Sequence, residues 1–205
     1  MLFIQYLAML LFIEATTLDV FYTLDLETLE LLNGSRLVLF DVVLLFLTDT
    51  AYAIGALLPV CFYVAGYFRK DKNLKLKAVQ YVLAMGLTVL IVGTLKYAVD
   101  RPRPFLNSTT ITQLAETGSP SFPSGHTACA VTAAVTLALM VRNNLFRAVV
   151  LAWALLIAYS RLALGVHYPS DVLTSVLLGT LAAILTDYAF RKHLLESPLV
   201  RRLGF

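Results

Sequence analysis

The chain of 205 residues is unusually apolar: 59% of its residues are hydrophobic, only 14% are charged, and the formal net charge is +3. A soluble domain carries about a quarter charged residues and about half apolar ones. The composition therefore excludes an ordinary soluble protein and indicates an integral membrane protein. The basic residues are not interleaved with an aromatic reading surface, which argues against a nucleic-acid partner. The length suits a single domain that covers residues 1–205.

The apolar stretches of the chain have the lengths of membrane-spanning helices, which need about 20 mostly apolar residues. The first expected span is 2–22, and its outer end is polar. Five further spans are expected at 51–68, 78–98, 124–141, 145–163 and 171–190. The sequence thus predicts an all-α membrane protein with about six transmembrane helices in one bundle.

Residues 24–49 separate the first two expected spans and mix acidic residues with leucines. The part around Glu27 and Glu30 has the composition of a helix that lies in the membrane interface. Residues 37–48 are apolar but short for a span, and we interpret them as interfacial or re-entrant. A seventh crossing at this point is the alternative.

Two glycines of the third expected span, Gly86 and Gly93, are two turns apart on one helix face. Small residues in this arrangement allow two transmembrane helices to approach each other closely. We therefore expect a close helix contact at these positions.

The distribution of Lys and Arg along the chain predicts how the spans are oriented across the membrane. Of the sixteen Lys and Arg residues, five lie in 69–77, two in 142–147 and four in 191–202. These segments share one side of a six-span scheme with both termini, and cytoplasmic loops carry the excess of Lys and Arg. We expect a multi-pass protein of the cell membrane with both termini in the cytoplasm. Four of the other five cations border the opposite loops, 97–123 and 164–170, where a bound anion would explain them.

Three polar segments reach this opposite, extracytoplasmic side. They run from Lys96 to Pro104 at the end of the third span, from Pro123 to His126 at the start of the fourth, and from Ser160 to Asp171 between the fifth and sixth. Ionisable residues at the ends of membrane spans are costly, so their convergence on one face predicts a functional site.

The cations and small residues of these segments are suited to a phosphate group. Arg103 and Arg161 each offer a planar fork to two oxygens, and Lys96 adds a point charge. Ser124 is a good N-cap, and the free N–H groups of a helix N-terminus attract anions. Gly125 lets the backbone approach the anion closely. The pattern predicts a cradle for a tetrahedral, doubly charged group.

Two histidines border this cradle. Asp171 follows His167 by four residues, and a carboxylate bonded to one imidazole nitrogen leaves the other nitrogen as a nucleophile. His126 is placed to give a proton to a departing oxygen. Each histidine alone would more often be structural, but all these residues occur together at one membrane face. We therefore favour a phosphoryl-transfer site.

These residues carry a clear resemblance to the type 2 phosphatidic acid phosphatase superfamily, which includes bacterial acid phosphatases and vanadium haloperoxidases. The family pattern is Lys, six residues, Arg-Pro; then Pro-Ser-Gly-His; then Ser-Arg, five residues, His, three residues, Asp. The chain matches every specified position, at Lys96, Arg103, Pro104, Pro123, Ser124, Gly125, His126, Ser160, Arg161, His167 and Asp171.

The resemblance implies a role for each matching residue. His167 is the expected nucleophile, Asp171 orients it, and His126 protonates the leaving group. The expected phosphate ligands are Lys96, Arg103, Arg161, Ser124 and Gly125. Arg101 is a secondary candidate, either as a contact to a second phosphate or as a partner of Asp100. Lipid phosphatases of this superfamily need no metal ion, so no metal site and no cofactor are expected.

The expected activity is hydrolysis of a lipid phosphate or diphosphate through a phosphohistidine. A polyprenyl diphosphate is the first candidate substrate; phosphatidic acid, diacylglycerol pyrophosphate and phosphatidylglycerol phosphate are the others. A phosphotransferase with the same intermediate and a non-catalytic lipid transporter are the alternatives. The expected partners are the lipid substrate and the membrane lipids, without an obligate protein partner.

Overall fold

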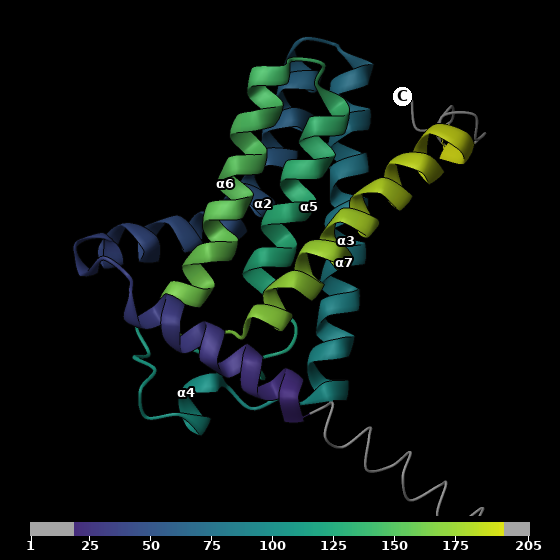
Figure 1. Cartoon of the computed structure of the whole chain (residues 1–205). Coiled ribbons are helices and arrows are strands. Elements are labelled where there is room, and N and C mark those ends of the chain that lie inside the picture. The colour runs from purple at the N-terminus through teal and green to yellow at the C-terminus, as the bar shows by residue number, and fades with distance from the viewer. Residues whose placement is uncertain (1–18, 195–205) are drawn as a thin grey trace, which may run out of the picture.

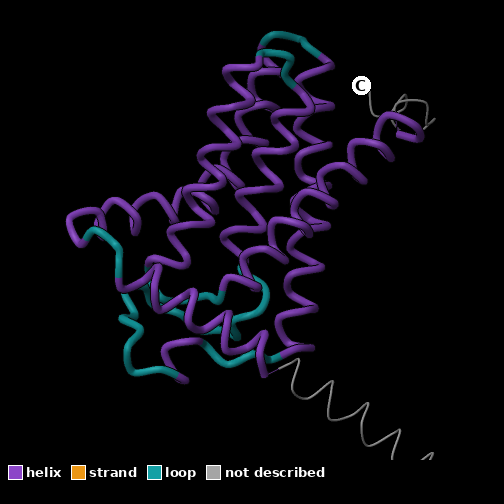
Figure 2. Tube along the Cα trace, viewed as in Figure 1, coloured by secondary structure: helices purple, strands orange, loops and turns teal. Residues whose placement is uncertain are grey.

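The computed structural model describes residues 19–194, and its regular elements are all helical. Residues 19–34 form a helix that precedes the numbered elements. The elements that follow are η1 (Val38–Phe40), α2 (Asp41–Phe68), α3 (Lys72–Val99), α4 (Pro104–Asn107), α5 (Gly125–Met140), α6 (Asn144–Ala163), α7 (Pro169–Ala189) and η2 (Phe190–Leu194). Figure 1 shows the long helices gathered in one bundle, and Figure 2 shows longer loops at the end where the helix of residues 19–34 lies. The predicted all-α bundle is confirmed.

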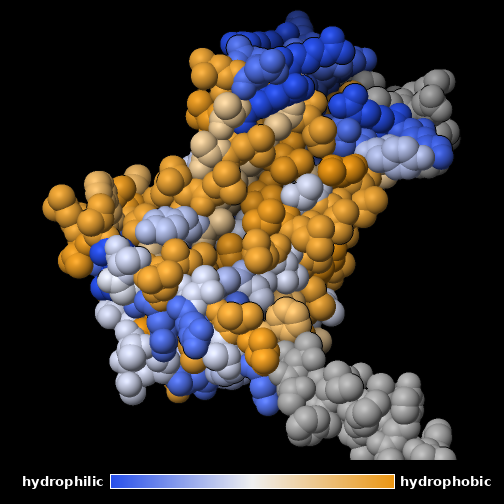
Figure 3. All heavy atoms as spheres, in the orientation of Figure 1, coloured by the Kyte–Doolittle hydropathy of each residue, from blue (hydrophilic) through white to orange (hydrophobic). Residues whose placement is uncertain are grey.

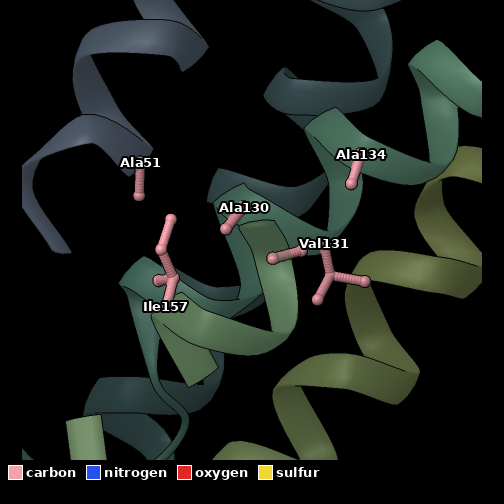
Figure 4. Close-up of a cluster of buried hydrophobic side chains, with 6 residues drawn as sticks. Ala51, Ala130, Val131, Ala134 and Ile157 are labelled. Atoms are coloured by element: carbon pink, nitrogen blue, oxygen red, sulfur yellow. The ribbon is translucent and has the colours of Figure 1, made fainter. Parts of the chain in front are cut away.

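Helix α5 is the centre of this bundle. It packs against α2, α3, α6 and α7, and ten of its residues are buried. Most of them are Ala, Thr or Val, whose small volumes let four neighbours approach one helix axis. A cluster of Ala51, Ala130, Val131, Ala134, Ala154 and Ile157 joins α2, α5 and α6 in this core, and Figure 4 shows part of it.

The polar ends of the bundle differ from each other. The turn between α2 and α3 and the loop between α5 and α6 lie together at one end, and the loops that carry the motif residues lie at the other (Figure 1). Figure 3 shows hydrophilic residues gathered at the first end, above an apolar band along the helices. Leu90 of α3, Leu155 of α6 and Leu173 of α7 are among the exposed apolar residues of these helices. Such a wide apolar surface fits a lipid environment.

Four of the described helical segments are long and apolar enough to cross a membrane: Val38–Phe68, Lys72–Asn107, Asn144–Ala163 and Pro169–Lys192. The protein is therefore a multi-pass membrane protein. The expected span at 124–141 corresponds to α5, which is apolar but has only 16 residues. Most of the first expected span, 2–22, lies outside the described residues. The total of six spans thus remains a prediction.

The chain before α3 departs from the sequence-based scheme. Residues 37–48 were expected as a separate segment, but from Asp41 onward they belong to α2, which is 28 residues long. Asp41 lies within this stretch and Asp49 directly follows it. These acidic residues interrupt the apolar pattern, so the start of α2 could not be recognised in the sequence. Asp41 lies in the first turn of α2 and pairs with Arg36 at 3.3 Å, a position where a negative charge is favourable. Figure 1 shows the first turns of α2 extending sideways from the bundle.

The close helix contact expected at Gly86 and Gly93 is not found. A Cβ atom added at either position would meet nothing within 4 Å. The close approach occurs at Gly179 of α7, where an added Cβ would lie 2.7 Å from the backbone oxygen of Ala128 in α5. Spacing within one helix does not tell which of its faces meets a neighbour.

Gly179→Ala should therefore destabilise the bundle, whereas Gly86→Ala should not. The first change forces α5 and α7 apart, at a typical cost of about 1–3 kcal/mol for overpacking. The second adds a methyl group to an open surface and removes a flexible residue from a helix. Thermal unfolding of both variants in detergent checks this, and equal midpoints would contradict the packing described.

Candidate active site

The motif end of the bundle contains a small polar cavity of about 150 Å³. Six of the residues singled out in the sequence line it: Lys96, Arg103, Gly125, His126, Arg161 and His167. Tyr52 of α2 and the loop residues 116–119 complete the wall. Ser124 and Asp171 are fully buried and are not part of the lining. The structure thus brings together residues that are more than 70 positions apart in the chain.

The cavity is rich in positive charge. Lys96 Nζ donates to the carbonyl of Pro120 at 2.6 Å, and Arg103 Nε donates to the carbonyl of Ser119 at 3.0 Å. Arg161 Nη1 donates to Thr48 Oγ1 at 2.8 Å. Among the ion pairs of residues 19–194, none includes Lys96, Arg103 or Arg161. These cations are held by neutral oxygens, so their charge is available to a bound anion.

The Nε atom of Arg161 supports this view. It is buried, and it has no hydrogen-bond partner within the described part of the chain. Leaving a buried charged donor unsatisfied is costly. An oxygen of a bound oxyanion would satisfy it, which makes Arg161 a fitting phosphate ligand.

The start of α5 forms another wall of the cavity. The Ser124 hydroxyl caps this helix by accepting from the Thr127 backbone N–H at 3.4 Å. The helix N-terminus adds a partial positive charge that favours an anion. A Cβ at Gly125 would lie 2.8 Å from the Tyr52 hydroxyl, so only glycine leaves room for this tyrosine. His126 follows, and its ring packs against that of Tyr52 with centroids 4.2 Å apart.

His167 lies in the loop between α6 and α7, and its two ring nitrogens have different neighbours. Arg103 Nη1 lies 3.0 Å from Nε2, and Asp171 Oδ2 lies 3.4 Å from Nδ1. Because a guanidinium can only donate, Nε2 must accept, and the proton of a neutral ring is then on Nδ1, facing the carboxylate. The contacts therefore specify a ring with its lone pair on Nε2.

Burial keeps this imidazole neutral. His167 is only 2% exposed, and removal from water lowers its pKa well below the usual 6.5, against the opposing effect of Asp171. The neighbouring Arg103 and Arg161 also lower the pKa. His167 is thus unprotonated at neutral pH, which is the state a nucleophile requires.

Asp171 is the anchor of this arrangement. It lies in the first turn of α7, and its carboxylate accepts from Arg101 Nη1 at 2.7 Å, from Ser121 Oγ at 2.5 Å and from the Tyr168 backbone N–H at 3.0 Å. A buried carboxylate with several donors stays ionised and fixed in orientation. The orienting role expected for Asp171 has a clear geometric basis.

The position of Arg101 differs from both sequence-based expectations. Its guanidinium pairs with Asp171 and with Asp25, each at 2.7 Å, and not with Asp100. It lines a separate surface cavity that includes Asp25 and Ser170, so it lies behind Asp171 and away from the phosphate cradle. Asp100 ends α3 in a left-handed conformation with φ of 47°. This turn directs the following Arg101 across the end of the bundle.

Four polar residues around the site were not found by sequence reasoning: Asp25, Thr48, Tyr52 and Ser121. Asp25 belongs to the acidic segment 24–49, and Thr48, Tyr52 and Ser121 lie outside the three motif segments. Thr48 and Tyr52 are four residues apart and so share one face of α2, which is the only sequence signal that they act together.

Comparison with known proteins is in agreement with the site. Residues 77–194, more than half of the chain, match the PAP2 superfamily. The chain belongs to this superfamily. This PAP2 protein is similar to the undecaprenyl-diphosphatase BcrC of Bacillus subtilis, with 30% identity over 145 residues that cover 71% of this chain and 72% of the relative. The family expected from the motifs is therefore confirmed.

Two solved PAP2-like structures have a similar fold. The crystal structure of Aquifex aeolicus LpxE superposes with a TM-score of 0.71 and 30% identity, covering 80% of this chain and 94% of that one. The transmembrane PAP2 type phosphatidylglycerolphosphate phosphatase from Bacillus subtilis superposes with a TM-score of 0.75, covering 92% and 94%. The identity to the second structure is 23%, so this likeness shows the fold alone.

Arg103→Ala should weaken the binding of inorganic phosphate to the purified protein in detergent. A hydrogen bond to a charged group contributes about 1.5–3 kcal/mol, so the dissociation constant should rise about 10- to 100-fold. Isothermal titration calorimetry measures this. Arg191→Ala is the control. Arg191 follows α7, pairs with Asp187 of that helix at 2.9 Å and does not line the cavity. Unchanged affinity in Arg103→Ala would contradict the cradle.

Proposed function

We propose that this protein is a membrane lipid phosphatase that hydrolyses a lipid phosphate or diphosphate through a phosphohistidine at His167. The observation that carries the proposal is the Nε2 lone pair of His167 at a cavity lined by three cations, none of which pairs with a carboxylate among residues 19–194. The undecaprenyl-diphosphatase among the similar proteins supports a phosphorylated lipid as substrate.

In the first step, Nε2 of His167 attacks the phosphorus in line with the leaving oxygen. A new N–P bond forms and the P–O bond to the lipid breaks. His126, which is protonated in the complex because the bound phosphate offsets the surrounding cations, gives its proton to the departing oxygen. The imidazole of His167 becomes positively charged, and Asp171 stabilises this charge at Nδ1–H. Lys96, Arg103 and Arg161 hold the phosphoryl oxygens as charge develops on them.

In the second step, water replaces His167 on the phosphorus. Neutral His126 takes a proton from the water, whose oxygen attacks the phosphorus while the N–P bond breaks. Inorganic phosphate leaves, His167 returns to its neutral form with the proton on Nδ1, and His126 is again protonated. The same histidine thus serves as acid and then as base.

We place this reaction at the extracytoplasmic face of the cell membrane, with both termini in the cytoplasm. The support is the polarity of the bundle: Arg69, Lys70 and Arg142 lie at the end opposite the cavity. Lys and Arg accumulate in cytoplasmic loops. The cavity would then face outward, next to the headgroups of the outer leaflet.

The substrate class is a lipid with a terminal phosphate, and the number of phosphates is open to direct test. In the sequence, Arg101 close to Arg103 was a candidate contact to a second phosphate and so favoured a diphosphate. Its guanidinium instead bonds Asp25 and Asp171, so Arg101 no longer supports a diphosphate. Phosphate release from a polyprenyl diphosphate, phosphatidic acid, diacylglycerol pyrophosphate and phosphatidylglycerol phosphate, each with and without a chelator, measures the preference. We expect release that persists with the chelator, because the family chemistry needs no metal.

His167→Ala should reduce phosphate release to background while the protein stays folded, because no other group replaces the nucleophile. His193→Ala is the matched control, since the third histidine lies outside the motifs. Steady release without any alcohol acceptor in the wild type distinguishes a hydrolase from a phosphotransferase. Near-normal release by His167→Ala would contradict the mechanism.

His126→Ala should make the phosphohistidine intermediate detectable. With p-nitrophenyl phosphate, whose leaving group needs no proton, phosphorylation of His167 still occurs, but hydrolysis lacks its base. The phosphoenzyme should accumulate, and intact-mass spectrometry should show one added phosphoryl group that is lost in acid. The added mass should be absent from His126→Ala/His167→Ala. Its persistence in the double variant would place the phosphoryl group elsewhere.

A further inference from the structure

The helix of residues 19–34 places the carboxylate of Asp25 against the residues that hold Asp171. Asp25 Oδ1 accepts from the Ser170 backbone N–H at 2.8 Å, and Oδ2 accepts from the Ser170 hydroxyl at 2.5 Å. Asp25 Oδ2 also accepts from Arg101 Nη2 at 2.7 Å. Asp25 therefore bonds both the first turn of α7 and the arginine that holds Asp171, although 145 residues separate it from Ser170.

Arg101 is a bridge between two carboxylates. Its Nη2 bonds Asp25, and its Nη1 bonds Asp171 Oδ1 at 2.7 Å. The guanidinium also lies over the Tyr168 ring, 3.7 Å from the centroid. The side chain is only 19% exposed, that of Asp25 is 9% exposed and that of Asp171 is fully buried. Electrostatic interactions are weakly screened at such sites.

The charges of Asp25, Arg101 and Asp171 together determine the electrostatic potential at His167. Arg101 alone would neutralise Asp171, and a neutralised carboxylate would stabilise the imidazolium of the phosphohistidine poorly. Asp25 offsets the charge of Arg101, so the three groups together present a net negative charge to His167. The fork of Arg101 also fixes the direction of the Asp171 carboxylate.

From these contacts we infer that Asp25 is a positioning residue for the phosphatase reaction, acting through Arg101 to keep Asp171 oriented and negatively charged behind His167. This inference rests on the proposed function. It makes the helix of residues 19–34 a part of the catalytic apparatus, although none of its residues lines the phosphate cavity.

A purely structural role for Asp25 is the competing view. Its two bonds to Ser170 could simply hold the helix of residues 19–34 against α7. The two views differ in one respect: a structural role does not depend on Arg101, whereas the inferred role disappears when Arg101 is absent. A double-mutant cycle separates them.

The experiment compares Asp25→Asn, Arg101→Gln and the double variant with the wild type in steady-state phosphate release and thermal unfolding. Asp25→Asn should lower kcat about 10-fold, the lower end of the loss typical when the outer partner of a functional group is removed. KM should change less than kcat, because the cradle is untouched. Glu27→Gln is the matched control: the same chemical change on an exposed residue of the same helix, with wild-type kinetics expected.

In the Arg101→Gln background, Asp25→Asn should have almost no further effect on kcat. An undiminished 10-fold loss in that background, or Asp25→Asn kinetics equal to those of Glu27→Gln, would overturn the inference. If Arg101→Gln does not fold, Ser170→Ala is the deciding variant. It removes the hydroxyl that bonds both Asp25 and Arg101 Nη1 but keeps the charges of Asp25 and Arg101 and the ion pair between them, so kcat should fall less than in Asp25→Asn. An equal or larger fall would overturn the inference. A wild type without phosphate release would instead refute the proposed function.

Discussion

The arrangement of this site depends on one buried charge, the carboxylate of Asp171. An ionised carboxylate inside a helix bundle costs several kcal/mol unless charged or polar donors surround it. Donors from separate segments meet this requirement: Arg101 after α3, Ser121 before α5, and the Tyr168 backbone N–H and His167 ring before α7. Satisfying Asp171 therefore fixes the loops that form the cavity, and it fixes which nitrogen of His167 carries the proton.

The bundle makes this concentration of charge tolerable. The small residues of α5 let four helices pack around it, and the charged groups of the site lie together at one end of the bundle. There the cations contact carbonyl and hydroxyl oxygens, which satisfy some of their donors without neutralising them. A phosphate group would supply the missing negative charge, so binding and the positioning of His167 arise from the same contacts.

Sequence reasoning identified six of the residues that line the cavity because their chemistry is local: each motif places a cation, a histidine or a helix cap at a fixed spacing. The helices from α3 to α7 were also recognisable, apart from the short α4, since their apolar runs are long. The partners of these groups were not. Asp25 and Tyr52 lie on helices whose facing sides depend on tertiary packing. For Arg101 the sequence offered a second phosphate or the neighbouring Asp100, because a partner that is distant in sequence cannot be recognised from sequence alone. Gly179, not Gly86, makes the close contact for the same reason.

The central claim is that His167 carries its proton on Nδ1, facing Asp171, and presents a lone pair on Nε2 to the cavity. Nitrogen-15 NMR of histidine-labelled protein in detergent at pH 7 measures this directly, with His167→Gln identifying the signals. The account predicts a neutral ring with a protonated Nδ1 and an unprotonated Nε2. A proton on Nε2, or a doubly protonated ring in the free protein, would contradict it.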